Sequence, residues 1–198
     1  MAGWPSRPSY NVPMLVLASA SPRRQELLRN AKIAFEVQPA HINEDPLPNE
    51  PARACAERLA REKAQAIGQK RPNDAVLGAD TVVVIDHLIL NKPSDASDAA
   101  RMLRLLSGRT HQVVTGVCLV ARGQCEVTSE TTSVTMSEIS EQEIAAYVAT
   151  GEPMDKAGAY AIQGIASRWI PRIEGDYSNV VGLPIALVYK MLRQAGLV

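Results

Sequence analysis

Apolar and polar positions along this chain follow two different periods. A short unbroken apolar run, or an alternation with a period of two, indicates a strand, whereas a period near 3.6 residues indicates a helix. The longest apolar run is rich in β-branched residues, and its one charge before its end is Asp80. Strands are predicted at 14–18, 33–37, 75–86, 111–121 and 125–136.

Helix signals fall between most of these strands. Ser21 is a candidate cap for a helix that has Pro22 in its first position, and Ser140 with Glu143 has the spacing of a capping box. Glycines follow several of the periodic stretches, as they do at helix ends. Helices are therefore predicted from Pro22 onward and over 49–68, 95–106, 140–151 and 184–194.

The order of these elements favours an α/β fold with a mixed sheet and a cleft. The hairpin over 111–136 interrupts the alternation of strands and helices, and two further short strands are expected at 160–163 and 168–174. A regular doubly wound parallel sheet would not contain that hairpin. The length of 198 residues suits one domain, or two small lobes that share a cleft. We expect residues 1–13, with three prolines, to form an extension before a domain over 14–198.

Composition excludes several classes of protein. Lys and Arg total 21, as do Asp and Glu, so the formal net charge of zero argues against a nucleic-acid partner. An aromatic content of 4% argues against a base-stacking surface. No apolar run approaches the ~18 residues of a membrane helix, so we expect no membrane partner. The three cysteines form no C-x-x-C motif, which favours reduced thiols and a cytoplasmic location over a zinc cluster or a disulfide scaffold.

The segment from Ser19 to Arg24 joins a predicted strand to a predicted helix start. Free N–H groups at a helix start attract anions, and arginine donates paired hydrogen bonds to phosphoryl oxygens. The segment therefore predicts a phosphate site, with an ordinary capped helix and solvated arginines as the alternative. The sequence contains no G-x-x-x-x-G-K-[ST] motif, which excludes a P-loop nucleotide site.

Single charged residues add candidate chemistry. A carboxylate inside an apolar strand is costly unless it is paired or metal-bound, so Asp80 is a candidate to activate water or to hold a metal, with a local turn cap as the alternative. Glu44 and Asp45 lie in a proline-rich loop, either as oxygen ligands of a divalent cation or as solvated acids. Lys92 would neutralise a polyphosphate, or lie on the surface.

Two later stretches, 152–164 and 174–184, are rich in glycines, amides and acids. Loops of this composition build binding clefts, and they also build plain turns. The sequence contains no Ser-His-Asp or Cys-His set that would indicate a covalent intermediate.

Taken together and in this order, these segments closely resemble the Maf family of nucleoside triphosphate pyrophosphatases. The resemblance covers about residues 14–195. The matching segments are LASASPRRQELL at 17–28, GADTVV at 78–83, KP at 92–93, LSG at 106–108, TG at 115–116, MDKAGAY at 154–160 and NVVGLP at 179–184.

This resemblance implies a fold and a reaction. The fold would be an elongated α/β structure whose two lobes and mixed sheet surround a central cleft, similar to that of the inosine triphosphate pyrophosphatases. The reaction would hydrolyse a small-molecule nucleoside triphosphate to the monophosphate and pyrophosphate. It would use a divalent cation such as Mg²⁺, Mn²⁺ or Co²⁺. A homodimer is common in the family and is therefore a possible assembly.

The resemblance also implies roles for individual residues. The catalytic acid falls on Asp80, which would activate the attacking water and hold the metal together with Glu44. The contacts to substrate fall on Ser19, Arg24, Lys92, Asp155 and Lys156.

Three further positions match the branch of the family that acts on dTTP and UTP. They are Arg23 after Ser-Pro, Thr81 after the catalytic acid, and Gln163. The other branch acts on 7-methyl-GTP and carries an aromatic residue in place of Arg23. Three alternatives stay open: other pyrimidine nucleotides with modified bases, a house-cleaning pyrophosphatase for 7-methyl-GTP or ITP, and a regulator of cell division that binds nucleotides without hydrolysing them.

Overall fold

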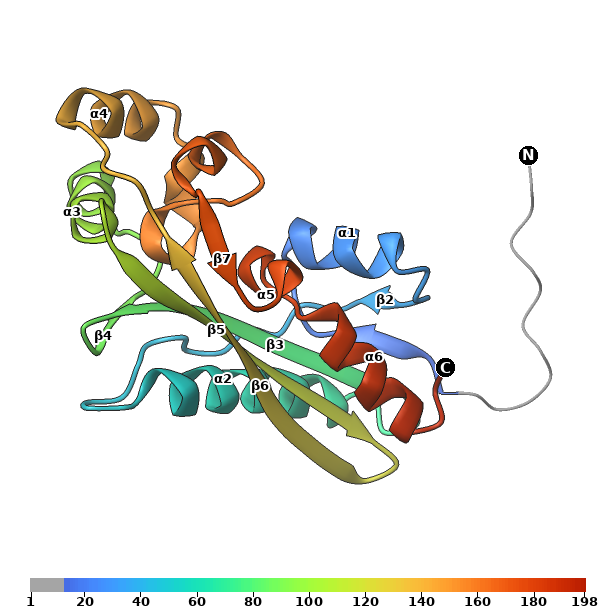
Figure 1. The fold of residues 1–198 in the computed structure, drawn as a ribbon. Coiled ribbons are helices and arrows are strands. Elements are labelled where there is room, and N and C mark those ends of the chain that lie inside the picture. The colour runs from blue at the N-terminus through green and yellow to red at the C-terminus, as the bar shows by residue number, and fades with distance from the viewer. Residues whose placement is uncertain (1–12) are drawn as a thin grey trace.

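A computed structural model describes residues 13–198, and residues 1–12 of the expected extension lie outside it. The described residues form an elongated α/β structure around one mixed sheet (Figure 1). The seven strands run in the order β2-β1-β3-β5-β6-β7, with β4 paired to β3, so the predicted mixed sheet is confirmed. The strands are β1 (Leu15–Leu17), β2 (Glu36–Val37), β3 (Ala75–Ile85), β4 (Leu88–Leu90), β5 (Thr110–Ala121), β6 (Gln124–Thr135) and β7 (Arg172–Glu174).

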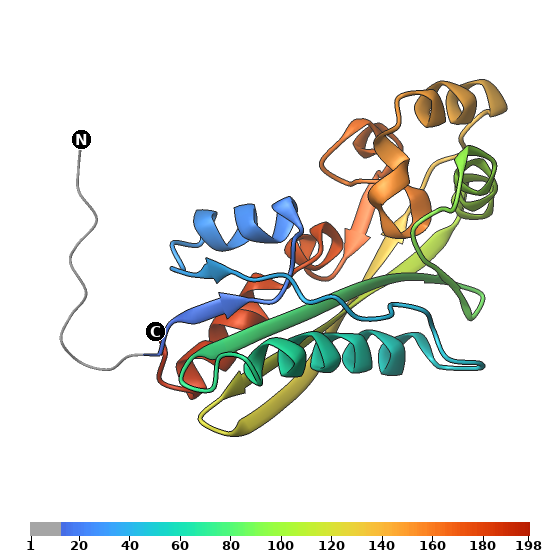
Figure 2. The same cartoon turned by 180° about the vertical axis from the view of Figure 1, so that it is seen from behind.

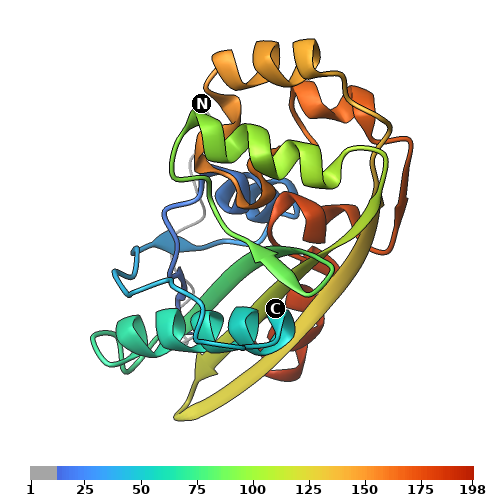
Figure 3. The same ribbon diagram turned by 90° about the vertical axis from the view of Figure 1, so that its left-hand side faces the viewer.

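Helices cover both faces of this sheet. Helix α2 lies along one face, whereas α1 and α6 pack on the other (Figure 2). Helices α3 and α4 lie together beyond one end of the long β5–β6 hairpin and form a second lobe (Figure 3). None of the helices within residues 13–198 is long and apolar enough to cross a membrane. The helices are α1 (Pro22–Asn30), α2 (Ala52–Gly68), α3 (Ala96–Leu106), α4 (Glu141–Ala149), α5 (Tyr177–Val181) and α6 (Ile185–Gln194).

Strand β3 has one edge that is only partly paired. It runs parallel to β1 along residues 75–77 and antiparallel to β4 along 83–85, while β5 pairs with its other edge over 76–84. Strands β1 and β4 therefore share one edge of β3, and the described sheet leaves residues 78–82 of that edge without a strand partner. Asp80 lies in the middle of this gap.

Two glycines let helix α2 approach the sheet closely. A Cβ atom on Gly78 of β3 would lie 2.2 Å from the carbonyl oxygen of Ala60, and one on Gly116 of β5 would lie 2.2 Å from that of Ala56. Both distances are far below any allowed contact, so only glycine fits at these positions. The backbone of α2 therefore rests directly on β3 and β5, and side chains of α2 reach the strands with little intervening space.

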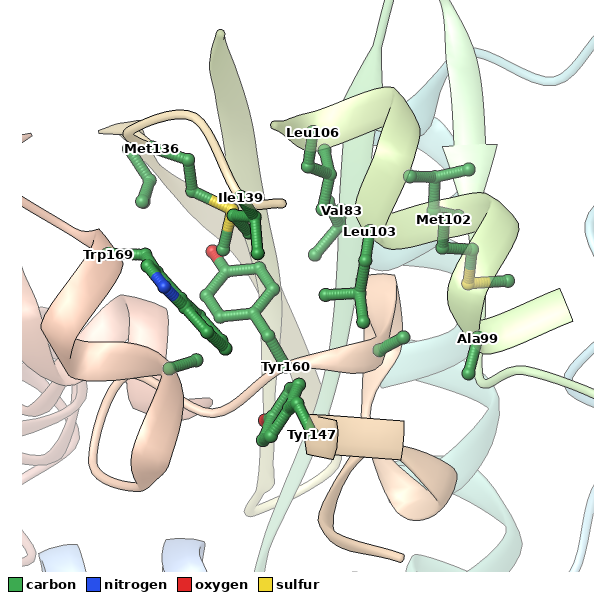
Figure 4. Close-up of a cluster of buried hydrophobic side chains, with 14 of the residues drawn as sticks. Val83, Ala99, Met102, Leu103, Leu106, Met136, Ile139, Tyr147, Tyr160 and Trp169 are labelled. Carbon is green, nitrogen blue, oxygen red and sulfur yellow. The ribbon is translucent and has the colours of Figure 1, made fainter. Parts of the chain in front are cut away.

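Each lobe has an apolar core of its own. On the sheet face opposite α2, Leu28, Leu77 and Val188 are fully buried where α1, β3 and α6 meet. In the second lobe, α3, α4 and the chain after α4 enclose a cluster that includes three aromatic side chains, Tyr147, Tyr160 and Trp169 (Figure 4). The rings of Tyr147 and Trp169 meet edge to face, with centroids 5.4 Å apart, and this geometry favours the pair.

Several predicted elements are shorter than expected or absent. The strand expected at 33–37 is reduced to β2, and the one at 168–174 is reduced to β7 because residues 165–169 form a 3₁₀ turn. The strand expected at 160–163 is wrong. Tyr160 has extended backbone angles, but residues 161–164 form a turn in which the Gly164 N–H donates to the Ala161 carbonyl oxygen at 3.1 Å, so no strand forms.

Local signals at helix starts have mixed outcomes. The capping box of Ser140 and Glu143 is confirmed at α4. Ser21 occupies the N-cap position of α1 as expected, but its side chain makes no capping hydrogen bond, and its N–H donates to the hydroxyl of Ser19. Pro22 does occupy the first turn of α1. Strand β4 and helix α5, which are only three and five residues long, were not predicted.

We expect Gly116→Ala to lower the free energy of unfolding by about 3 kcal/mol, because a methyl group there collides with the α2 backbone. Urea unfolding measures the change. Gly123→Ala is the matched control: nothing lies within 4 Å of its Cβ position, so only its positive φ opposes the substitution, at about 1 kcal/mol. An equal loss of unfolding free energy in the two variants would contradict the close packing of α2 on β5 at Gly116.

Candidate active site

A cavity of about 600 Å³ opens over the unpaired edge of β3, between the two lobes. It is lined by the end of β1, the start of α1, the loop after β2, the middle of β3, and the chain that follows α4. The structure brings every residue that was predicted for the site to this one cavity. These residues are Ser19, Arg23, Arg24, Glu44, Asp80, Thr81, Lys92, Asp155, Lys156 and Gln163.

The alternation of β3 sends two neighbouring side chains to opposite faces of the sheet. Asp80 lies on the α2 side, where its Oδ1 accepts a hydrogen bond from Lys63 Nζ at 2.6 Å. Thr81 lies on the other side, where its hydroxyl is 3.0 Å from an Arg24 guanidinium nitrogen. Asp80 is only 7% exposed, so Lys63 supplies the partner that a buried carboxylate requires.

Lys63 joins two carboxylates at the bottom of the cavity. Its Nζ lies 2.6 Å from Asp80 Oδ1 and 2.6 Å from Glu44 Oε1. Lys92 Nζ approaches the other oxygen of Glu44 at 3.2 Å. Burial raises the pKa of Glu44, but hydrogen bonds and charge from the two lysines outweigh it and hold the pKa below its ordinary value. Glu44 is therefore ionised at neutral pH.

Sequence reasoning missed Lys63, although the sequence carries a signal for it. Lys63 lies on the buried face of α2, between Leu59 and Ile67, where the helical period predicts an apolar residue. It is only 5% exposed. A lysine on an apolar stripe indicates a buried acidic partner, and that partner here is Asp80.

Arg24 ties three segments of the cavity wall together. Its guanidinium donates to the carbonyl oxygens of Gly182 and Ala79, both at 2.8 Å, and to the Ser19 hydroxyl at 3.2 Å. These bonds join the start of α1 to the unpaired edge of β3 and to the turn after α5. The role of Arg24 as a triphosphate contact stays a prediction, while its contacts in the protein orient the wall.

Arg23 reaches across the mouth of the cavity to the second lobe. Its guanidinium lies 3.1 Å from Asp155 Oδ2, and Lys156 contacts the same carboxylate from the other side. Burial raises the pKa of Asp155, but hydrogen bonds from Lys156 and Arg23 more than offset it and leave the pKa below its ordinary value. Arg23, although 29% exposed, is therefore held in one orientation by the opposite lobe.

A buried pair supports the wall that carries Gln163. Tyr160 lines the cavity three residues earlier, and its hydroxyl lies 2.7 Å from His111 Nε2. Burial lowers the pKa of His111 to about 4, so the ring is neutral at pH 7. The other ring nitrogen, Nδ1, has no hydrogen-bond partner within residues 13–198.

Comparisons with known proteins agree with this arrangement. A sequence profile of the family described as Maf-like protein matches residues 14–195. A protein of Koribacter versatilis named dTTP/UTP pyrophosphatase is 61% identical over 188 residues, which is 94% of this chain and 97% of the relative. Proteins of the same name from Syntrophomonas wolfei and Symbiobacterium thermophilum are 48% and 50% identical, over 91% and 92% of this chain and 96% and 94% of their own lengths.

The His111–Tyr160 pair predicts a pH-dependent stability. Below pH 6.5 the unfolded chain binds a proton at this histidine, whereas the folded chain binds it only near pH 4. Stability from His111 is therefore complete above pH 6.5 and is lost as the pH falls toward 4, by about 3 kcal/mol in the limit.

Urea unfolding between pH 7.5 and pH 4 checks this prediction in wild type, His111→Gln and His87→Gln, at roughly half-unit steps. We expect His111→Gln to lose part of the slope, and the control at the exposed His87 to keep it. A slope that His111→Gln leaves unchanged would contradict the assignment.

Proposed function

Because this chain belongs to the Maf family of Maf-like proteins, we propose that its cavity hydrolyses dTTP and UTP to the monophosphate and pyrophosphate. One observation carries the proposal most strongly. The carboxylates of Asp80 and Glu44 meet at one lysine inside a cavity whose other walls carry arginines and lysines. Such a site combines groups that activate water with groups that bind a polyanion.

The cationic side chains account for substrate binding in a protein without net charge. A nucleoside triphosphate carries several negative charges, and the chain has equal numbers of acidic and basic residues. Attraction must therefore come from local groups, and Arg23, Lys92 and Lys156 line the cavity from three separate segments. The first turn of α1 lies beside them and adds its N–H groups.

Asp80 is the proposed general base. In the proposed step, a water oxygen forms a bond to the α-phosphorus while one of its protons passes to a carboxylate oxygen of Asp80. The bond between the α-phosphorus and the bridging oxygen breaks, and pyrophosphate leaves with the electron pair. Lys63 holds Asp80 in place from the α2 side through a hydrogen bond of 2.6 Å.

The residues present fit a divalent cation that shares its ligands with the substrate. Mg²⁺ in enzymes usually takes one or two carboxylates together with phosphate oxygens. Asp80 and Glu44 supply two carboxylates, and residues 13–198 contain no group of three or more His, Cys, Asp or Glu side chains placed to hold an ion alone. When bound, such a cation would neutralise charge on the phosphoryl oxygens.

Base selectivity is proposed to come from the residues that match the pyrimidine branch. Gln163 lines the cavity, and its amide can both donate to and accept from a pyrimidine edge. Arg23 is held by Asp155 at the cavity mouth, and Thr81 is fixed by Arg24 and by the hydroxyl of Thr115 at 2.9 Å. A wall of fixed polar groups discriminates well between bases.

We also propose a cytoplasmic location and a homodimer. The three cysteines are free, which suits a reducing compartment. The homodimer is implied by the family resemblance, and the molecular mass in solution tests it.

The proposal is tested by product analysis with dTTP, UTP, 7-methyl-GTP and ITP, each with Mg²⁺ or Mn²⁺ and with a chelator. We expect metal-dependent pyrophosphate and monophosphate from dTTP and UTP. Asp80→Asn should lower kcat by at least ~100-fold because the general base is lost, while thermal unfolding shows that the variant folds.

Other products would point elsewhere. Orthophosphate would mean that a different bond is broken. Hydrolysis of only ITP or 7-methyl-GTP would overturn the assignment to pyrimidines, and tight binding without turnover would favour the regulatory protein.

Arg23→Tyr tests the selectivity assignment. We expect kcat/KM for dTTP and UTP to fall by about 10- to 100-fold, because tyrosine cannot make the charge-assisted hydrogen bond that Arg23 is proposed to donate to the nucleotide. Arg29→Tyr is the matched control, since it changes the same residue type on the same helix but does not line the cavity. Steady-state kinetics with the four nucleotides give the comparison, and an unchanged preference in Arg23→Tyr would remove this residue from base selection.

A further inference from the structure

The chain between α4 and β7 carries three of the predicted substrate contacts and has little regular structure. Asp155, Lys156 and Gln163 all lie on residues 153–164, which we call the cavity loop. The cavity loop contains two short 3₁₀ turns and no strand. Hydrogen bonds between paired strands therefore do not fix its position. Its middle is held by a hydrogen bond from the Gly158 N–H to the Asn91 carbonyl oxygen at 3.1 Å and by the contact of Tyr160 with His111. Its two ends meet at Glu152.

The carboxylate of Glu152 joins the cavity loop to helix α4. Its Oε1 accepts a hydrogen bond from the Tyr147 hydroxyl at 2.9 Å and another from the backbone N–H of Ile165 at 3.1 Å. Tyr147 belongs to α4, whereas Ile165 is the first residue after the cavity loop. One carboxylate therefore binds the segments before and after the loop and fixes the distance between its ends.

The backbone of Glu152 makes a second contact with the same loop. Its carbonyl oxygen accepts a hydrogen bond from Lys156 Nζ at 2.6 Å. Lys156 lines the cavity, while Glu152 itself is not among the cavity-lining residues. Glu152 thus contacts Lys156, a predicted substrate-binding residue, from outside the cavity.

Gly164 is the residue that makes room for this carboxylate. A Cβ atom on Gly164 would lie 2.1 Å from Glu152 Oε1, which is far inside contact distance. The φ of Gly164 is −103°, a value that any residue adopts, so space and not backbone conformation requires the glycine. The Glu152 carboxylate therefore occupies the space that a side chain at position 164 would need.

Tyr147, the residue of α4 that donates to Glu152, is held rigidly. Tyr147 is fully buried, packs edge to face on Trp169, and lies in the apolar cluster of the second lobe (Figure 4). Burial, with Glu152 as a neighbour, raises the pKa of Tyr147 well above its ordinary value, so its hydroxyl stays a donor at every working pH. A buried donor that faces a carboxylate makes a strong, well-defined bond.

We propose that Glu152 is a positioning residue for substrate binding: it closes the cavity loop so that Lys156 and Gln163 face the nucleotide. This inference rests on the proposed function for its effect on catalysis, but the ordering of the loop is a property of the protein alone. Asp80, Lys63 and Glu44 belong to other segments, so the chemical step is expected to depend little on Glu152.

The variant Glu152→Gln tests the proposal at constant size. An amide oxygen in the place of Oε1 still accepts from Tyr147 and Ile165, but the negative charge that strengthens both bonds is lost. The NH₂ group replaces Oε2, which lies 3.4 Å from the Ile165 nitrogen, and so turns one donor toward another. We expect KM for dTTP to rise about tenfold, with kcat within about threefold of wild type, because binding residues lose their order while the base is untouched. Gly164→Ala should reproduce this pattern, because its methyl group displaces the carboxylate.

Glu143→Gln is the matched control. Glu143 lies on α4 and, like Glu152, accepts from an aromatic side chain, here Trp169 Nε1 at 3.1 Å, but within residues 13–198 no hydrogen bond joins it to the cavity loop. It should lower stability and leave KM unchanged. An equal rise of KM in Glu143→Gln would reduce the role of Glu152 to general stability of the lobe and overturn the proposal.

Hydrogen exchange of the nucleotide-free protein separates this inference from the proposed function. We expect amides of residues 154–165 to exchange about tenfold faster in Glu152→Gln than in wild type, and at the wild-type rate in Glu143→Gln. Unchanged exchange in Glu152→Gln would overturn the inference whatever the enzyme does. A wild-type protein that hydrolyses no nucleotide would instead overturn the proposed function, and the exchange result would still decide the role of Glu152.

Discussion

The close approach of helix α2 to strands β3 and β5 is the constraint on which the site depends. Gly78 and Gly116 remove the side chains that would separate the helix from the sheet. At this distance, Lys63 reaches Asp80 at 2.6 Å across the interface while remaining buried. A Cβ atom at either glycine would move the helix outward and leave the carboxylate without its cation, which is costly in a buried setting.

A gap in the edge of the sheet lets Asp80 line the cavity. Strands β1 and β4 occupy the two ends of one edge of β3, and the cavity opens over the five residues between them. Asp80 is thus held from the helix side and faces the cavity at a break in the sheet. Arg24 donates to the buried carbonyl oxygen of Ala79 in this gap, so a backbone group that would pair with a strand is satisfied by a side chain.

Sequence reasoning anticipated what depends on local pattern and missed what depends on distant contacts. Strand β3 and helix α2 have strong periodicity and were predicted, and the motif residues gathered in one cavity as expected. Lys63 was overlooked because its partner is seventeen residues away and on another element. A strand was predicted at 160–163, but a turn closed by the Ala161 carbonyl oxygen and the Gly164 N–H ends the extended backbone after Tyr160.

The central claim is that a water molecule activated by Asp80 attacks the α-phosphorus of a pyrimidine nucleoside triphosphate. Hydrolysis of dTTP in water enriched in oxygen-18, followed by mass spectrometry of both products, tests this most directly. The account predicts one heavy oxygen in the thymidine monophosphate and none in the pyrophosphate, because the new bond forms at the α-phosphorus. Heavy oxygen in the pyrophosphate would place the attack at the β-phosphorus and contradict the proposed geometry.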